Sequence, residues 1–355
     1  MYDVLIVGAG PAGSTLARMI GKKYKVLLLD KRFNPTSGST RSKCCGGLLA
    51  PDAQHILGTL GLALPRDILV GPQIFKVRAI DLQSGLDKYY QRFYINMDRE
   101  KFDRWLISLL PPSVETRFGK YLVSVEPGNP IRVQLLGGNH PETLECKVLV
   151  GADGAASAVR RQHFASAANP RSYLAIQEWF PTTEIMPYFS AIFEPTITDF
   201  YSWIIPKENC LVMGTALPPG KTVWHRYSRL KQALNHYGFN LGKSIKQESA
   251  LVLRPTRPGD ILTGRGQVLL IGEAAGLISP SSAEGLSYAF TSALYASKSL
   301  NEGLVNPAAR YHKMARSLSR NISSKSIKSS LIYFAPARRS IMASGLFTMK
   351  VENTK

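Results

Sequence analysis

The sequence is poor in cysteine and in acidic residues, and it has no long apolar run. Only 4 of its 355 residues are cysteines, and two of these are adjacent, which argues against the disulfide framework of a small secreted protein. No stretch of about twenty uncharged apolar residues is present, so we expect no membrane-spanning helix. The N-terminus lacks the basic region, apolar core and cleavage site of a secretory signal. We therefore expect a cytoplasmic protein, either free or peripheral on the inner face of a membrane.

Basic residues outnumber acidic ones. The chain has 44 Lys and Arg against 25 Asp and Glu, a formal net charge of +19. Such a charge suits the capture of an anionic cofactor or substrate, an anionic membrane surface or a nucleic acid. The sequence shows no zinc-finger spacing, RNA-binding sheet signature or helix-turn-helix pattern, so we expect no nucleic-acid partner and no metal site.

The C-terminal region is the most uneven in charge. From residue 310 onward it contains one acid, Glu352, and apolar residues at 331–334 and 341–342 lie among basic ones. The basic residues are Arg310, Lys313, Arg316, Arg320, Lys325, Lys328, Arg338, Arg339, Lys350 and Lys355. This mixture suits an anionic membrane surface. The alternative is a solvated helix pair whose apolar sides pack on the body of the protein.

The clearest pattern is a glycine motif close to the N-terminus. An apolar run over residues 2–7 leads into Gly8-x-Gly10-x-x-Gly13, a helical stretch follows, and a second apolar run ends in Asp30. Gly8 permits a tight turn, Gly10 leaves room for a pyrophosphate, and Gly13 lets the helix pack closely on the strand. The helix N-terminus directs N–H groups at the phosphates, and Asp30 is spaced to accept from the adenosine ribose. This order predicts a dinucleotide site.

Two later segments repeat the pattern of a buried strand that ends in an acid and glycines. Residues 148–154 end in Asp153 and Gly154 ahead of a helix, a pattern that Asp153 as a helix cap also explains. Residues 268–276 end in Glu273 and a glycine-rich stretch that we expect to start a helix. An acid at that place can accept from a ribityl hydroxyl, and a helix N-terminus can stabilise negative charge on phosphate or flavin.

A fourth element is the predicted helix over residues 98–110, for which Asp98 is a plausible N-cap. Arg99 at its start is either a surface charge or a fork that binds phosphate or cofactor oxygens.

In this order, the four elements resemble the flavin-dependent oxidoreductases of the para-hydroxybenzoate hydroxylase fold. The resemblance covers roughly residues 1–300 and implies FAD as the cofactor, with its ADP half at the glycine motif. Glu273 stands where that group has Asp, and it keeps the charge. The resemblance places these residues at the cofactor: Gly8, Gly10, Pro11, Ala12, Gly13, Asp30, Lys31, Arg41, Cys45, Gly46, Gly47, Arg99, Asp153, Gly154, Gly272, Glu273, Gly276 and Gly285.

Two further motifs narrow the resemblance. Residues 42–48, SKCCGGL, look like the Lys-Pro-Cys-Gly-Gly element of geranylgeranyl reductases, and residues 201–206, YSWIIP, resemble their Tyr-x-Trp-x-Phe-Pro element. The sequence differs from the family at Cys44 (for Pro), Ile205 (for Phe) and Thr198 (for Pro). CbrA-type members are the most similar in length and motif. The resemblance implies reduction of isolated double bonds in an isoprenoid or other lipid-like substrate.

The resemblance assigns catalysis to Cys45, Tyr201 and Trp203. A long, dry, apolar pocket closed by Tyr201 and Trp203 suits an unactivated alkene, and Cys45 is placed to donate a proton or to shape the pocket. The alternatives are a small residue packed in a glycine turn for Cys45 and a core pair for the two aromatics. Only one dinucleotide fingerprint is present, so the electron donor stays open between NAD(P)H and a ferredoxin-type protein. Rival functions are an aromatic monooxygenase, a halogenase and a flavin-bearing protein without turnover.

These features predict an α/β fold with a Rossmann-like FAD-binding domain, an inserted and mostly antiparallel β substrate domain, and a helical C-terminus. The FAD-binding domain is expected over residues 1–75, 97–165 and 255–300, the substrate sheet over 76–96 and 166–254, and the basic helical segment over 301–355.

Overall fold

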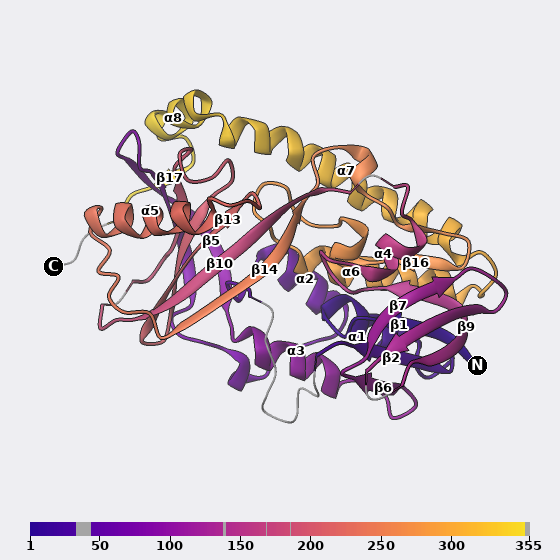
Figure 1. Ribbon diagram of the computed structural model, residues 1–355. Coiled ribbons are helices and arrows are strands. Elements are labelled where there is room, and N and C mark those ends of the chain that lie inside the picture. Colours follow the sequence, from indigo (N-terminus) through magenta and orange to yellow (C-terminus); the bar gives the residue numbers. More distant parts are fainter. Residues whose placement is uncertain (33–43, 138–139, 168, 185, 352–355) are drawn as a thin grey trace.

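The structure is a computed structural model that describes residues 1–32, 44–137, 140–167, 169–184 and 186–351. Two β-sheets lie at opposite ends of the molecule, and the long strands β10 (Arg171–Pro181) and β14 (Lys246–Arg254) reach from the second sheet toward the first (Figure 1). Among the described residues, no helix is both long enough and apolar enough to cross a bilayer.

The first sheet has the order β15-β16-β9-β1-β2-β6, and β7 and β8 extend it from β9. Its core strands from β16 to β6 are parallel. The strands are β1 (Tyr2–Val7), β2 (Val26–Asp30), β6 (Glu115–Phe118), β7 (Tyr121–Glu126), β8 (Ile131–Leu136), β9 (Glu142–Gly151), β15 (Gly264–Arg265) and β16 (Val268–Leu270).

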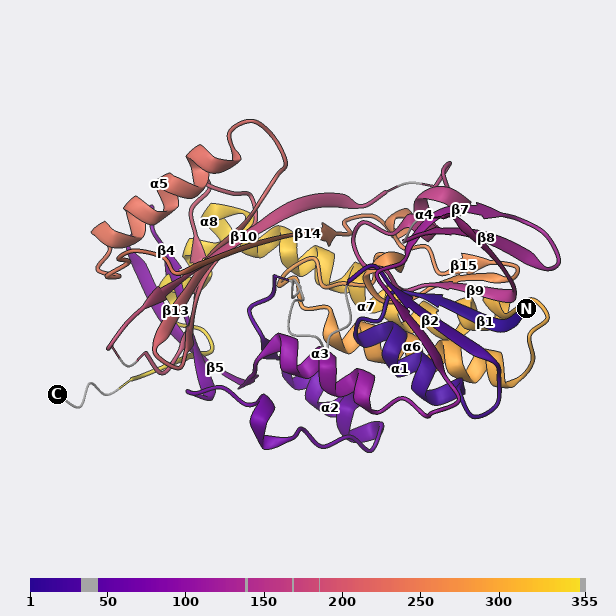
Figure 2. The same ribbon diagram turned by 60° about the horizontal axis from the view of Figure 1, so that its bottom comes forward.

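The central strands of this sheet are nearly continuous apolar runs because both faces are covered. Helices α1 (Pro11–Ile20) and α6 (Leu286–Asn301) bury side chains against one face, while β7, β8 and α4 (Ala158–His163) cover the other. Figure 2 shows these two layers below and above the strands.

The second sheet has the order β14-β10-β13-β12-β11-β4-β5-β17, with β3 paired to β5. Its pairs are antiparallel apart from β4 with β11. The remaining strands are β3 (Leu48–Leu49), β4 (Ile74–Asp81), β5 (Leu86–Asn96), β11 (Phe189–Phe193), β12 (Ser202–Lys207), β13 (Cys210–Leu217) and β17 (Thr348–Met349). Helix α5 (Val223–His236) packs Leu230 and Leu234 on one face of this sheet.

The other helices connect and cover the two sheets. Helices α2 (Pro51–Thr59) and α3 (Arg99–Ser108) share an apolar cluster with Phe290 of α6. Short 3-10 helices are η1 (Arg66–Ile68), η2 (Pro258–Asp260) and η3 (Gly272–Ala275), and the chain continues into α7 (Pro307–Tyr333) and α8 (Ala335–Ser344).

The predicted fold class is confirmed, including the antiparallel sheet and the helical C-terminus. The predicted helix start at residues 272–276 is wrong. Only the single turn of η3 forms there, because Gly276 with φ of 78° ends it in the left-handed region, and α6 begins at Leu286 with Gly285 as its N-cap.

Candidate functional site

The predicted nucleotide motifs meet at one edge of the first sheet. Strands β16, β9, β1 and β2 are neighbours, and Gly151 is in register with both Val7 and Leu270. The motifs follow the carboxyl ends of these strands: Gly8 to Gly13 after β1, Asp30 at the end of β2, Asp153 and Gly154 after β9, and Gly272 to Gly276 after β16. Open α/β sheets bind ligands at this edge.

The three motif glycines have different surroundings. A Cβ atom on Gly8, whose φ is 107°, would lie 2.4 Å from the Ala152 carbonyl oxygen, and one on Gly13 would lie 1.9 Å from the Gly8 carbonyl oxygen. A Cβ on Gly10 would meet no heavy atom of the described chain within 4 Å. Gly8 and Gly13 are therefore required by the turn itself, whereas Gly10 borders open space.

That open space lies at the start of α1. The helix begins at Pro11, and its N-cap, Gly10, has no side chain with which to cap the first N–H groups. Pro11 and Ala12 are buried in the first turn. An uncapped helix N-terminus beside free space is a fitting site for a pyrophosphate, so the residues present fit the ADP half of FAD.

The Asp30 carboxylate is fully bonded within the protein. Its Oδ1 accepts from the backbone N–H and Nε of Arg32 at 2.8 and 3.0 Å, and its Oδ2 accepts from the Ala9 N–H at 2.8 Å and from Arg32 Nη2 at 3.0 Å. Burial alone raises the pKa of Asp30, but its bonds to Arg32 hold that pKa below its usual value. A carboxylate has about four acceptor positions, so a ribose can bond to Asp30 only by displacing Arg32. The adjacent Lys31 is exposed.

The N-cap of α4 is Ser157, whose hydroxyl accepts from the Arg160 N–H at 3.0 Å, and Asp153 supports this helix start from outside it. Its carboxylate accepts from the Ala158 N–H at 2.6 Å and from Ser157 Oγ at 2.5 Å at the start of α4. Burial raises the pKa of Asp153. Gly154 follows with φ of 74°. Since the Ala152 carbonyl lies against Gly8, this turn supports the glycine motif through its backbone.

Glu273 and its glycines lie beside the start of α1. Glu273 Oε1 accepts from the Leu253 N–H of β14 at 3.0 Å, and the Gly272 N–H donates to Ser292 Oγ at 2.9 Å. A Cβ on Gly272 would lie 3.1 Å from the Cβ of Ala12. The third motif therefore joins the second sheet to the nucleotide edge.

The second group of predicted residues gathers on one face of β12. The loop of residues 44–47 packs against it: a Cβ on Gly46 would lie 2.5 Å from Ile205 Cδ1, and one on Gly47 would lie 2.5 Å from Lys207 Nζ. The conformation of Gly47, with φ of 61°, also favours glycine. Close packing thus accounts for both glycines, and their predicted contact with the cofactor stays a prediction.

Tyr201 and Trp203 lie next to each other on this face, with ring centroids 5.7 Å apart. The Tyr201 hydroxyl donates to the Ser282 carbonyl at 2.7 Å, and burial raises the pKa of Tyr201. The Trp203 ring covers Gly214, and its buried Nε1 has no hydrogen-bond partner among the described residues. The two rings therefore form an aromatic wall, in which Trp203 Nε1 is a hydrogen-bond donor without a partner among the described residues.

Cys45 lies near two basic side chains. Arg99, the first residue of α3, and Lys207 both interact electrostatically with the Cys45 sulfur, which also accepts from the Gly47 N–H at 3.4 Å. Burial opposes the charge of Arg99, yet Asp103 at 2.9 Å and Cys45 raise the pKa of Arg99. The predicted N-cap of α3, Asp98, is confirmed, since its carboxylate accepts from the N–H groups of residues 100 and 101.

Lys207 is the site residue that the motif search missed. It is 4% exposed, and its Nζ donates to the carbonyls of Met97 at 2.7 Å and Gly47 at 3.1 Å. Burial lowers the pKa of Lys207 to about 7. The signal was present in the sequence, because Lys207 continues the alternation of Tyr201, Trp203 and Ile205 along one face.

An ion-pair chain joins the two groups of residues. Arg32, which binds Asp30, also donates to Asp103 at 3.3 Å, and Asp103 in turn binds Arg99 beside Cys45. Asp30, at the end of β2, is therefore linked to the loop of residues 44–47 through charged side chains. The predicted cofactor residue Arg41 lies outside the described residues.

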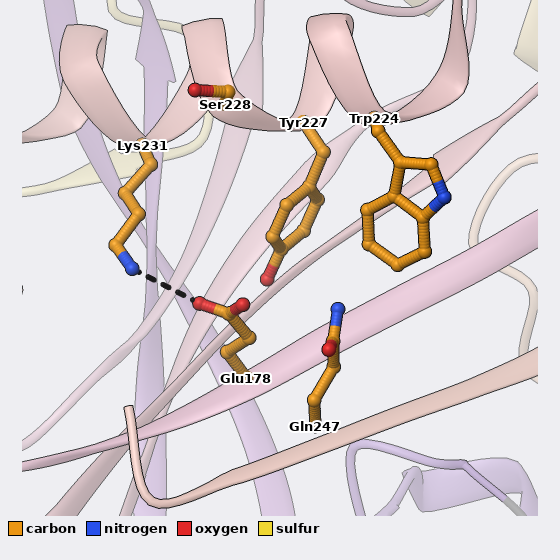
Figure 3. Close-up of a pocket in the computed structure, with 6 residues that line it drawn as sticks. All are labelled: Glu178, Trp224, Tyr227, Ser228, Lys231 and Gln247. Atoms are coloured by element: carbon orange, nitrogen blue, oxygen red, sulfur yellow. Dashed lines mark hydrogen bonds and ion pairs between the residues drawn. The ribbon is translucent and has the colours of Figure 1, made fainter. Parts of the chain in front are cut away.

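A separate hollow of about 450 Å³ lies between α5 and strands β10 and β14. Figure 3 shows its lining, in which Lys231 pairs with Glu178 at 3.1 Å and Tyr227 and Trp224 extend from α5. None of the predicted site residues lines it, and we assign it no function.

No family model matches the chain. Protein CbrA of Escherichia coli O9:H4 (strain HS) is 40% identical over 349 residues, which cover 97% of this chain and 94% of that protein. The chain belongs to the CbrA family. Other proteins of that name from Escherichia and Shigella strains match equally well.

Solved structures share the fold of this CbrA-family chain at low sequence identity. A geranylgeranyl bacteriochlorophyll reductase-like protein from Thermoplasma acidophilum superposes with a TM-score of 0.78 and 20% identity, over 99% of this chain and 93% of that one. PqsL, described as a probable FAD-dependent monooxygenase from Pseudomonas aeruginosa, superposes with a TM-score of 0.68 and 17% identity, over 97% of this chain and 99% of that one. The chain thus shares its fold with a reductase-like protein and with a probable FAD-dependent monooxygenase, so this fold serves more than one reaction.

Proposed function

We propose that this CbrA-family protein is an FAD-dependent oxidoreductase that reduces carbon–carbon double bonds of an isoprenoid chain. FAD, when bound and reduced, supplies a hydride from N5 of its flavin ring. An external reductant, NAD(P)H or a ferredoxin-type protein, provides the electrons.

The observation that carries the proposal is the packing of the Cys45 loop on the Tyr201–Lys207 face of β12. The two sequence elements that resemble the geranylgeranyl reductases are more than 150 residues apart in the sequence, yet Gly46 and Gly47 lie directly against Ile205 and Lys207. The nucleotide edge, with its open space at Gly10, supplies the matching place for the ADP half of FAD.

The residues of this face suit an apolar substrate. The Tyr201 hydroxyl is bonded to the Ser282 carbonyl, so Tyr201 presents its ring and not an acid. Together with Trp203 it forms a wall for a chain that cannot accept hydrogen bonds.

Cys45 is the residue that we assign to proton transfer. Addition of a hydride to one alkene carbon leaves the other in need of a proton, which the Cys45 thiol donates. The thiolate left behind is stabilised by Arg99 and Lys207 and is reprotonated from solvent.

The test is anaerobic incubation of the FAD-loaded protein with dithionite and geranylgeranyl diphosphate, followed by mass spectrometry. We expect a mass gain of about two units for each double bond reduced, and no gain with Gly10→Val, which blocks the cofactor. No gain with FAD present and reducible would refute the isoprenoid reductase. Incorporation of label from ¹⁸O₂ into an aromatic substrate would instead identify a monooxygenase.

A further inference from the structure

The outward faces of α7 and α8 have a composition found nowhere else in the chain. Between residues 303 and 351 the sequence has nine Lys or Arg and no Asp or Glu. The two helices follow one another along the upper edge of the molecule in Figure 1.

Some of these basic residues form ion pairs with acidic residues of the same chain. Arg338 pairs with the buried Asp81 at 2.7 Å, and Lys325 pairs with Asp52 at 3.3 Å. Another group is exposed: Lys313, Arg316, Arg320 and Lys328 on α7, and Lys350 after α8. The four on α7 are spaced by three, four and eight residues, so they form one stripe along the helix.

Apolar side chains extend the same stripe toward the C-terminal end of α7. Ile327, Leu331 and Phe334 follow at spacings of four and three residues, and Ile327 is 72% exposed. Three further apolar side chains are exposed after α7: Ile341 on α8, and then Leu346 and Phe347, the last of which is 84% exposed. Soluble proteins rarely leave such a run of apolar residues in water without a binding role.

The inner side of the same helix end contacts the candidate site. The Tyr333 ring packs 5.3 Å from that of Phe200, and its hydroxyl donates to the Ser281 carbonyl, next to Ser282, which binds Tyr201. The inner side of α7 therefore contacts the aromatic wall through Phe200, whose ring centroid lies 5.0 Å from that of Tyr201.

We propose that this C-terminal surface docks on the anionic face of a lipid bilayer. The basic stripe of α7 contacts lipid phosphates, and the apolar residues from Ile327 to Phe347 enter the interface between headgroups and acyl chains. A second copy of the chain is a poor occupant, because it would bring two surfaces of the same positive charge together. Docking is independent of the redox reaction and places the candidate site next to lipid.

The test is flotation of the full-length protein with vesicles of phosphatidylcholine alone or with one quarter phosphatidylglycerol. We compare wild type with two triple variants, K313Q/R316Q/R320Q and L331Q/F334Q/F347Q. A third variant, K221Q/R229Q/K243Q, removes the same charge from exposed positions on and around α5 and is the matched control.

We expect binding only to vesicles that contain phosphatidylglycerol, weakened about 100-fold by the basic variant and lost with the apolar variant. The control should bind like wild type, and 0.5 M NaCl should release the protein. Equal binding to pure phosphatidylcholine, or equal loss in the control, would overturn the proposal. The proposal would also be overturned if the wild-type protein bound no vesicles and formed a dimer that the apolar variant could not form. That result would assign the surface to self-association. Flotation needs neither FAD nor turnover, so its outcome is distinct from that of the reductase assay.

Discussion

Replacing Gly10 and Gly13 separately distinguishes a cofactor-binding glycine from a structural one. Gly10 has an extended backbone, with φ of −75°, and a Cβ there meets nothing in the described chain within 4 Å. In Gly10→Val, loss of the glycine N-cap lowers the free energy of unfolding by about 0.5 kcal/mol. The lower conformational entropy of the unfolded chain raises it by about the same amount. The apoprotein should therefore keep its free energy of unfolding within about 0.5 kcal/mol.

FAD binding by the same variant should fail, because the valine side chain occupies the space in front of α1. We expect at least a 100-fold loss of affinity, which corresponds to about 2.8 kcal/mol. Gly13→Ala gives the opposite pattern. Its Cβ would lie 1.9 Å from the Gly8 carbonyl oxygen, a backbone atom that cannot move aside, so the apoprotein should lose more than the ~1–3 kcal/mol usual for overpacking.

The assays are urea unfolding of the apoproteins and fluorescence titration with FAD. Normal FAD affinity in Gly10→Val would refute the assignment of the glycine edge as the cofactor site. Wild-type stability in Gly13→Ala would show that the close contact between the glycine turn and α1 is misjudged. An unfolded Gly10→Val apoprotein would also contradict the reasoning, because the structure leaves its side chain free.

Three further predictions follow from buried charges and from the thiol. Burial lowers the pKa of Lys207 to about 7, so the unfolded chain binds more protons than the folded one between pH 7 and pH 10. Relative to Lys207→Met, the free energy of unfolding of the wild type should therefore rise over this range by up to ~1.4 kcal/mol per pH unit. The same stability difference between the two proteins in urea unfolding at pH 7 and at pH 9.5 would contradict this. Cys45→Ser should retain FAD and lose turnover, and unchanged kinetics would leave Cys45 a packing role. Arg338→Met leaves the fully buried Asp81 poorly paired and should lower the free energy of unfolding in urea by about 3 kcal/mol. Arg339 lies at the exposed edge of the same ion pair, so Arg339→Met should lower it by under ~1 kcal/mol. Equal losses of stability in the two variants would refute this.

The fold was predictable because its signals are local. Apolar runs at residues 2–7 and 26–29 followed by a glycine turn or an acid specify buried parallel strands. The wrong helix start after Glu273 arose because strand, acid and glycine also occur ahead of a single 3-10 turn. Gly276 ends that turn with φ of 78°, and a Cβ there would lie 2.6 Å from the Asp260 carbonyl oxygen, a contact that its neighbours in the sequence do not reveal.

The partners of the site residues were less predictable than their positions. Arg32 belongs to no motif, yet it binds Asp30 and Asp103, which are 73 residues apart in the sequence. Lys207 could have been found by extending the alternation of β12 by one step. Its hydrogen bonds to the Met97 and Gly47 carbonyls depend on how the two sheets meet, and no sequence pattern carries that information.

The acids of the nucleotide edge have a common electrostatic role in the structure. Asp30, Asp153 and Glu273 were each predicted from a strand end, and each accepts hydrogen bonds from the protein: from Arg32 and Ala9, from the start of α4, and from β14. A carboxylate that is already paired or bonded to N–H groups repels a neighbouring pyrophosphate less than a free one. We therefore expect the N-terminus of α1 and the space at Gly10, and not these three acids, to bind the pyrophosphate.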